Sequence, residues 1–101
     1  MSRKAFAKNL SRVLAILELK LNQGELYINP NTRCDVLSEY SYAWTSKDKS
    51  FHVRVFLADW YSPFTQALWE FFYKDKFIFS SDYFVQFLID LRKWKDECSR
   101  D

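Results

Sequence analysis

The 101-residue chain has few of the residues from which small catalytic sites are built. It contains one glycine, Gly24, one histidine, His52, and two cysteines, Cys34 and Cys98. Phosphate-binding loops, nucleophile elbows and dinucleotide-binding turns need glycine where the backbone takes a positive φ angle or closely approaches a ligand. One glycine cannot build these structures, so we expect none of these enzyme classes.

The scarcity of histidine and cysteine also argues against a metal centre. A zinc site would need Cys34, Cys98, His52 and a carboxylate to converge from four elements. The carboxylates are scattered, and neither a D-x-D nor an H-E-x-x-H motif occurs. We expect a non-enzymatic protein with no catalytic residue, metal or cofactor, in which His52 lies on the polar face of a strand and the cysteines are small buried apolar side chains.

Long hydrophobic runs are missing as well. The longest, Val13 to Leu17, is far shorter than the roughly 20 residues that span a bilayer. The basic N-terminus resembles the start of a secretory signal, but no A-x-A-like cleavage site follows. Two cysteines in a chain of this length do not make a disulfide framework. We expect a cytoplasmic protein that does not enter a membrane.

Aromatic and charged residues are abundant instead. Phe, Trp and Tyr make up 20% of the sequence, charged residues 28%, and the formal net charge is +2. A hydrophobic fraction of 49% is enough for a folded core, and the length is typical of one domain. We expect a single small α+β domain over residues 1–101, with an antiparallel sheet packed by helices on one face.

Three helices are expected from the hydrophobic spacing. The first covers residues 4–22, where apolar residues recur every three or four positions, and Gly24 follows as its stop. Ser62-Pro63 is a typical helix start and predicts a second helix over 63–74. Ser80-Ser81-Asp82 supplies capping residues for a last helix, which is expected to run to about Cys98.

Strands are expected between these helices. Residues 25–29 read as a short strand, and two alternating runs near 40–45 and 51–58 read as a hairpin. Phe77-Ile78-Phe79 is too short to classify and is either an edge strand or an extended linker. The predicted order is α-β-β-β-α-(β)-α.

The hairpin register follows from burial of one apolar face. A two-residue loop at Lys47-Asp48 would keep the aromatic and aliphatic side chains together, whereas a three-residue loop would mix the two faces. The expected pairs are Trp44 with Phe51, Tyr42 with Val53 and Tyr40 with Val55.

The order α-β-β-β-α is similar to that of the double-stranded RNA-binding domain. The likeness concerns topology alone, because the last helix begins Asp82-Tyr83-Phe84 where that family has a lysine-rich start. No residue role is carried over from the family.

Seven apolar or aromatic residues fall off the core faces of the expected elements. Trp and Tyr dominate the binding energy of many protein interfaces, so these residues predict a surface for a protein partner or for a second copy in a homodimer. They are Ile16, Leu19, Phe56, Trp60, Tyr61, Trp69 and Tyr73. We expect an interaction module, of the kind used by steric inhibitors and accessory proteins of viruses and mobile elements.

A basic stripe on the first helix supports an alternative function. Lys4, Lys8 and Arg12 recur every four residues and share one side of the helix, with Arg3 beside them. Such a stripe neutralises phosphates in some proteins and is an ordinary solvated helix face in others. RNA or DNA binding through these four residues is the second choice, because a net charge of +2 is low for such domains.

The aromatic row Tyr40, Tyr42 and Trp44 has two interpretations. Aromatic side chains spaced by two on an open sheet can stack unpaired bases. They can also fill a core, and the apolar side chains Phe51 and Val53 on the neighbouring strand favour the core.

Overall fold

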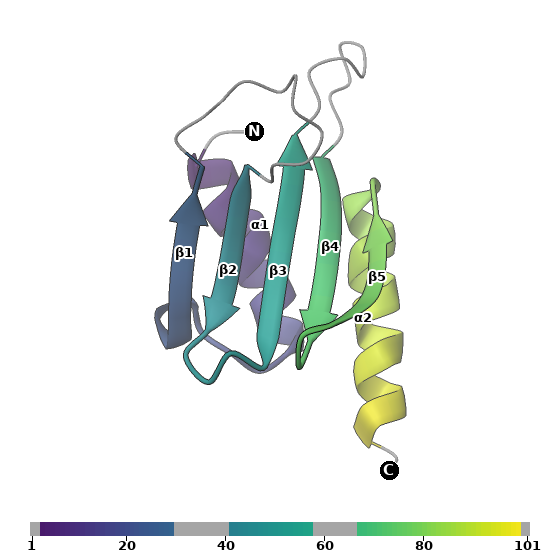
Figure 1. Cartoon of the computed structure of the whole chain (residues 1–101). Helices are drawn as coiled ribbons and strands as arrows, with labels where there is room; N and C mark the ends of the chain where they lie inside the picture. The colour runs from purple at the N-terminus through teal and green to yellow at the C-terminus, as the bar shows by residue number, and fades with distance from the viewer. Residues whose placement is uncertain (1–2, 30–40, 58–66, 100–101) are drawn as a thin grey trace.

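The chain forms a five-stranded antiparallel sheet that carries both of its long helices on one face (Figure 1). The structure, a computed structural model, describes residues 3–29, 41–57 and 67–99. Its elements are α1 (Arg3–Ile16), the short 3-10 helix η1 (Leu21–Gln23), β1 (Gly24–Ile28), β2 (Tyr42–Ser46), β3 (Phe51–Leu57), β4 (Ala67–Tyr73), β5 (Lys76–Ser81) and α2 (Phe84–Ser99). The expected α+β class, with helices on one face of an antiparallel sheet, is confirmed.

The strands lie side by side in sequence order, β1-β2-β3-β4-β5, and each pairs antiparallel with the next. The order of elements is α-β-β-β-β-β-α, which departs from the predicted order because β4 stands where a helix was expected. It departs from the order of the double-stranded RNA-binding domain for the same reason. None of the described helices is long and apolar enough to span a bilayer.

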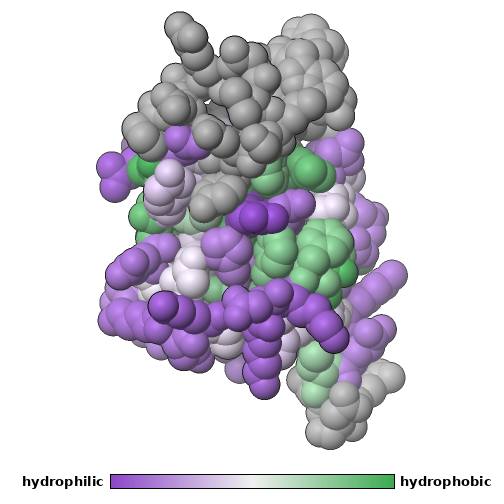
Figure 2. All heavy atoms as spheres, in the orientation of Figure 1, coloured by the Kyte–Doolittle hydropathy of each residue, from purple (hydrophilic) through white to green (hydrophobic). Residues whose placement is uncertain are grey.

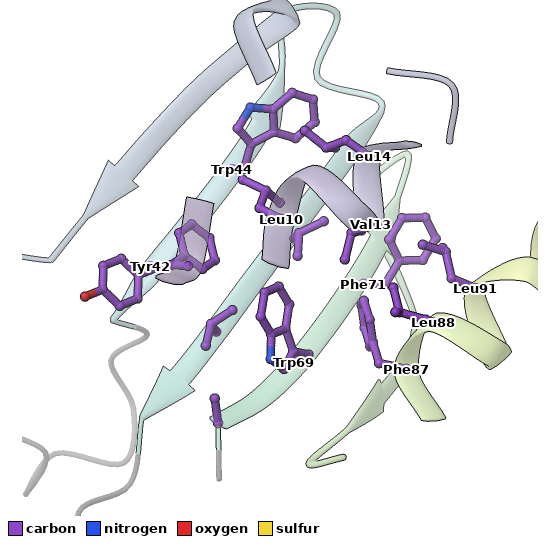
Figure 3. Packing of buried hydrophobic residues seen from close by; sticks show 14 of the residues in the cluster. Leu10, Val13, Leu14, Tyr42, Trp44, Trp69, Phe71, Phe87, Leu88 and Leu91 are labelled. Carbon is purple, nitrogen blue, oxygen red and sulfur yellow. The ribbon is translucent and has the colours of Figure 1, made fainter. Parts of the chain in front are cut away.

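The hydrophobic core lies between one face of the sheet and the two helices. Each helix presents a stripe of apolar residues three or four positions apart to the sheet, and alternate residues of the central strands meet them (Figure 3). The buried helix residues are Phe6, Leu10, Val13 and Leu14 on α1 and Phe87, Leu88 and Leu91 on α2. The buried strand residues include Tyr42, Trp44, Val53, Val55, Trp69 and Phe71.

The aromatic row on β2 belongs to this core. Tyr42 stacks on Phe6 with their ring centroids 4.7 Å apart, and Trp44 is fully buried. Tyr40 lies outside the described residues. The core interpretation of Tyr42 and Trp44 is therefore confirmed, and these two rings cannot stack bases.

The helix predicted over 63–74 is wrong, because residues 67–73 form the strand β4. Its apolar residues fit two periods at once: Ala67, Phe71 and Phe72 have helical spacing, whereas Ala67, Trp69 and Phe71 alternate. Burial in β4 follows the alternation, so Trp69 points into the core and Phe72 away from it. Aromatic residues favour strands, and pairing with both β3 and β5 outweighs the local helix signal.

The β4–β5 turn explains why Phe77-Ile78-Phe79 is a strand. Lys74 and Asp75 both take positive φ angles, 50° and 63°, and Tyr73 pairs with Lys76 across them. Two residues of positive φ make the tight hairpin turn that matches the twist of the strands. The edge-strand interpretation of 77–79 is confirmed.

The β2–β3 hairpin has the predicted faces but not the predicted register. Trp44 pairs with Val53 and Tyr42 with Val55, a shift of two residues that leaves every side chain on its expected face. The turn is longer than expected because Asp48 organises it. The Asp48 carboxylate accepts hydrogen bonds from the Ser46 hydroxyl and from the backbone N–H and hydroxyl of Ser50.

Hydrogen bonding within the turn lowers the pKa of Asp48 to about 2, because the hydroxyl of Ser46 and both donors of Ser50 stabilise the carboxylate. The Ser46 hydroxyl oxygen also accepts a 3.0 Å hydrogen bond from the Phe51 N–H. This network closes the turn without the Asn-Gly pair that a two-residue loop would need.

Helix α1 ends at Ile16, earlier than the predicted residue 22. Glu18 takes a φ of 60°, its N–H bonds to the Ala15 carbonyl, and the Leu19 N–H bonds to the Leu14 carbonyl. These two bonds form a Schellman motif, in which Leu19 turns back toward the core and packs against it. A glutamate, Glu18, therefore occupies the left-handed position after the helix that usually holds glycine.

Gly24 does not end α1, as predicted, but directly follows the short η1 and begins β1. A methyl group on its Cα would overlap the indole of Trp44 and the carbonyl oxygen of Thr45. The indole is fixed there because its Nε1–H donates a 3.1 Å hydrogen bond to the Leu21 carbonyl. The close approach of Trp44 requires the one glycine of the sequence at this position.

Replacing Gly24 with alanine should destabilise the fold by about 1–3 kcal/mol, because the added methyl group overpacks the site against a fixed indole. Urea unfolding followed by tryptophan fluorescence measures the effect. Glu25→Ala, at the neighbouring exposed position, is the control and should change the free energy of unfolding by less than about 0.5 kcal/mol. Equal stability of Gly24→Ala and wild type would contradict this account of Trp44.

Glu18→Gly should stabilise the protein by about 0.5–1 kcal/mol, because glycine takes the positive φ angle without the steric cost that a Cβ adds. Glu18→Ala is the matched control. It also removes the exposed ion pair with Lys95, 3.4 Å long, but keeps the Cβ, so it should bring no gain. Thermal unfolding measures both variants. Equal melting temperatures of the alanine and glycine variants would show that the positive φ angle does not cause the gain in stability.

Candidate binding surfaces

The structure places most of the seven predicted protein-binding residues against the core. Trp69 is only 1% exposed, and Ile16, Leu19 and Tyr73 are half-buried and pack on the core cluster. Trp69 and Tyr73 were expected outside because their segment was predicted as a helix, and Ile16 and Leu19 because they leave the apolar stripe of the helix predicted over 4–22. Trp60 and Tyr61 lie outside the described residues.

Among the described members of that set, Phe56 lies on the face of the sheet away from the helices. Neither α1 nor α2 covers this face, which is the one turned to the viewer in Figure 1. Cross-strand pairing arranges its side chains in rows that run across the strands. One row is Glu25, Thr45, His52, Phe72 and Phe77, the next is Tyr27, Ala43, Arg54, Glu70 and Ser80, and the third contains Phe56 and Leu68.

Arg54 is the centre of this helix-free face. Its Nη2 and Nε lie 2.9 Å and 3.1 Å from the same carboxylate oxygen of Glu70. Its guanidinium carbon also lies 4.3 Å from the ring centroid of Phe72 and 5.7 Å from that of Phe56. Ion pairing and cation–π contacts together fix the guanidinium over two half-buried rings.

Phe77 is the most exposed aromatic side chain among the described residues of this face, at 51%. Its ring centroid lies 5.6 Å from that of Phe72 in an edge-to-face contact, so the two rings continue the Arg54 cluster toward the β5 edge. Figure 2 shows apolar side chains gathered over the β4 and β5 side of this face, with hydrophilic ones along the end that carries the turns. At the opposite edge, Tyr27 on β1 is 47% exposed.

His52 lies on the polar side of β3, as its alternation predicts, and contacts neighbours on the same face. Its Nδ1 is 2.7 Å from the Thr45 hydroxyl oxygen, and its ring lies 5.6 Å from that of Phe72. Burial lowers the pKa of His52, and the positive charge of Arg54 adds to the effect, while Asp75 opposes it. The neutral imidazole is thus favoured in the folded protein.

The basic stripe on α1 is a second surface. Arg3, Lys4, Lys8 and Arg12 are all exposed, and α1 contains no acidic residue. Arg12 also lies over the ring of Phe84 on α2, with 5.3 Å between its guanidinium carbon and the ring centroid. Within residues 3–29, 41–57 and 67–99, the ion pairs are Arg54–Glu70 and Lys95–Glu18, and neither involves the stripe.

No three side chains of His, Cys, Asp or Glu come close enough to hold a metal ion in the part of the chain that the structure describes. Cys98 is exposed rather than buried, although its spacing continues the apolar stripe of α2. The reason is that the end of α2 extends past the sheet, so none of the described strands faces that part of the helix (Figure 1). Cys34 lies outside the described residues.

The lowered pKa of His52 predicts a pH dependence of stability. The unfolded histidine titrates near 6.5, so its contribution is complete above that pH and is lost as the pH falls through the lower folded pKa. Between pH 7.5 and 5, wild type should therefore lose more free energy of unfolding than His52→Gln, which cannot titrate. Urea unfolding at each pH checks this, and parallel curves for the two proteins would contradict it.

Compared with protein-family models, with curated proteins and with solved structures, the chain shows no match to any of the three. The helix-free face and the basic stripe are thus the two features of the described structure from which a function can be inferred.

Proposed function

We propose that the protein is a non-enzymatic protein-binding module whose contact surface is the helix-free face of the sheet, and that the partner of this face is a second copy of the chain. The observation that supports it most is the aromatic surface around Arg54, of which Phe77 is exposed and Phe56 and Phe72 are half-buried. Aromatic residues and arginine are enriched in the buried centres of protein interfaces and carry much of their binding energy. Phe56, Phe72 and Phe77 surround Arg54 here.

The charge of the face favours a protein over a nucleic acid. Arg54 is already neutralised by the mostly buried carboxylate of Glu70, and Glu25 adds an exposed carboxylate, while His52 favours its neutral form. A single-strand-binding sheet combines its aromatic rings with a positively charged groove. The described part of this face has the rings without the excess of positive charge.

The same charges make the face complementary to itself. In a symmetric dimer the same patch faces its own copy, so each charge must find its opposite within one surface. Arg54 and Glu70 supply such a pair near the middle of the sheet. Two sheets that pack face to face keep their strands within about 30° and bury their apolar side chains between them. This contact would cover Phe72 and Phe77 from water.

The dimensions of the sheet set the expected strength of pairing. Five strands about 4.8 Å apart and roughly 20 Å long offer a footprint of about 500 Å² per copy. Two such faces bury roughly 1,000 Å², at the low end of specific interfaces. We expect a reversible dimer with a dissociation constant of roughly 10–100 µM.

A dimer of this kind would act by occupying surfaces rather than by chemistry. It would present two copies of its remaining surface to a further protein, as a small steric inhibitor or accessory protein of viral or mobile-element type does. The free, exposed thiol of Cys98 is consistent with a reducing cytoplasm, where exposed thiols persist.

Phe77→Asp should weaken self-association at least about tenfold, because the dimer would bury an unpaired carboxylate where it now buries an aromatic ring. Sedimentation velocity between 10 and 500 µM measures the effect. Wild type should shift from monomer toward dimer across this range, and the variant should remain a monomer. Phe77 is half exposed, so the melting temperature of the variant should stay close to that of wild type.

Tyr83→Asp is the matched control. Tyr83 is a comparably exposed aromatic residue, at 58%, but precedes α2 and lies outside the sheet. This variant should dimerise as wild type does. A wild-type chain that stays monomeric at 500 µM contradicts the proposal, and equal weakening by both variants shows that the contact is not the helix-free face.

A further inference from the structure

The charge of the chain is concentrated on one element. Helix α1 carries four basic side chains and no acidic one, a charge of +4 over 14 residues. The whole chain has 15 basic and 13 acidic side chains, so the rest has 11 and 13 and a charge of −2. A modest net charge of +2 therefore hides a strongly basic helix on an otherwise slightly acidic protein.

We propose that the solvent face of α1 binds the phosphate backbone of duplex nucleic acid without reading its sequence. Lys4, Lys8 and Arg12 repeat every four residues, which places them along one side of the helix over about 12 Å. Arg3 flanks the row, and all four side chains are exposed. Cations without acidic neighbours can neutralise successive phosphates and release their counterions.

Arg12 is already oriented for such a contact. Its guanidinium lies over the Phe84 ring at the junction of α1 and α2, so less side-chain freedom is lost on binding than for a fully mobile arginine. Guanidinium groups also bind phosphate in a two-pronged geometry, whereas the lysines act as point charges. Arg12 is thus the most ordered member of the row.

The burial of the apolar side of α1 favours a nucleic acid over a membrane. A basic amphipathic helix binds a bilayer by inserting its apolar face among the lipids. Here Phe6, Leu10, Val13 and Leu14 are at most 1% exposed, because they form the protein's own core. The helix can offer charge to a polyanion but has no free apolar face to insert.

The absence of exposed rings on the described part of α1 favours a duplex over a single strand. Proteins that hold single strands stack the bases on aromatic side chains. The one aromatic residue of α1, Phe6, is fully buried, and the exposed residues of α1 other than the four cations are Ser11 and Ala15. A surface of this kind can contact phosphates but cannot stack bases or distinguish them.

Fluorescence anisotropy with a fluorescein-labelled 24-base-pair DNA duplex, and with an RNA duplex of the same sequence, tests the proposal. Both duplexes should bind at 50 mM salt. The duplex that binds with the higher affinity identifies whether DNA or RNA is the natural ligand. With three or four phosphates contacted, the slope of log K against log salt should be about −2.7 to −3.6. Changing Lys4 and Lys8 together to glutamine should reduce the magnitude of this slope by about two units.

Changing Lys47 and Lys49 together to glutamine is the matched control. It removes the same charge from exposed lysines that lie in the β2–β3 turn and not on α1, and should leave the slope unchanged. Equal losses in the two double variants would overturn the assignment to α1. The single substitution Lys8→Glu, at an exposed position, should also weaken duplex binding. It replaces the double variant of α1 in the test if that variant does not fold.

Two further probes complete the test. A 24-nucleotide single strand and vesicles containing 30% phosphatidylserine should bind more weakly than the duplexes. Tighter binding to either one, or no binding of the duplexes at 100 µM protein, would overturn the proposal. The inference does not rest on the proposed protein-binding function, because Phe77→Asp should leave duplex affinity unchanged.

Discussion

The position of both helices depends on the indole of Trp69. Its ring lies 5.6 Å from that of Phe6 on α1, and 4.8 Å and 5.7 Å from those of Phe84 and Phe87 on α2. One buried residue of β4 thus contacts the first helix and the last helix of the chain at once. Because a large aromatic side chain buries much area, both helices gain most by covering the same face of the sheet.

Covering one face has a direct consequence for the other. Strand residues alternate, so a chain that supplies aromatic residues at successive positions of β4 must place some of them opposite the core. Trp69 and Phe71 are buried under the helices. Phe72, the next residue along β4, lies on the helix-free face. Arg54 covers Phe72 there, which limits the exposed apolar area in the monomer without removing it.

The sequence was sufficient to predict the parts of the fold in which one period dominates. The apolar stripe within α1 and the faces of the β2–β3 hairpin were predicted correctly, because burial there follows a single spacing. Residues 67–73 fit both periods, and only pairing with β3 and β5 decides between them. The register of the hairpin depended on Asp48, whose hydrogen bonds within the turn have no simple sequence signature.

The candidate surfaces differ in how far the sequence could predict them. The basic stripe was found because a helix face is set by local spacing, and its four residues are all exposed. The aromatic surface was mostly missed: Phe56 was predicted, whereas Phe72 and Phe77 were not. Their placement together requires the β4–β5 turn, where Lys74 and Asp75 take positive φ angles that non-glycine residues seldom adopt.

The two surfaces lie on opposite sides of the molecule, and this separation governs how they can work together. The sheet and the core separate the helix-free face from the solvent side of α1. Because packed layers lie about 10 Å apart, the two surfaces are more than about 10 Å from each other. In a dimer joined through the sheets, the two copies of α1 therefore face outward in opposite directions. A single straight duplex could not contact both stripes, so the proposed pairing would add no second contact to one duplex and would instead enable the dimer to join two.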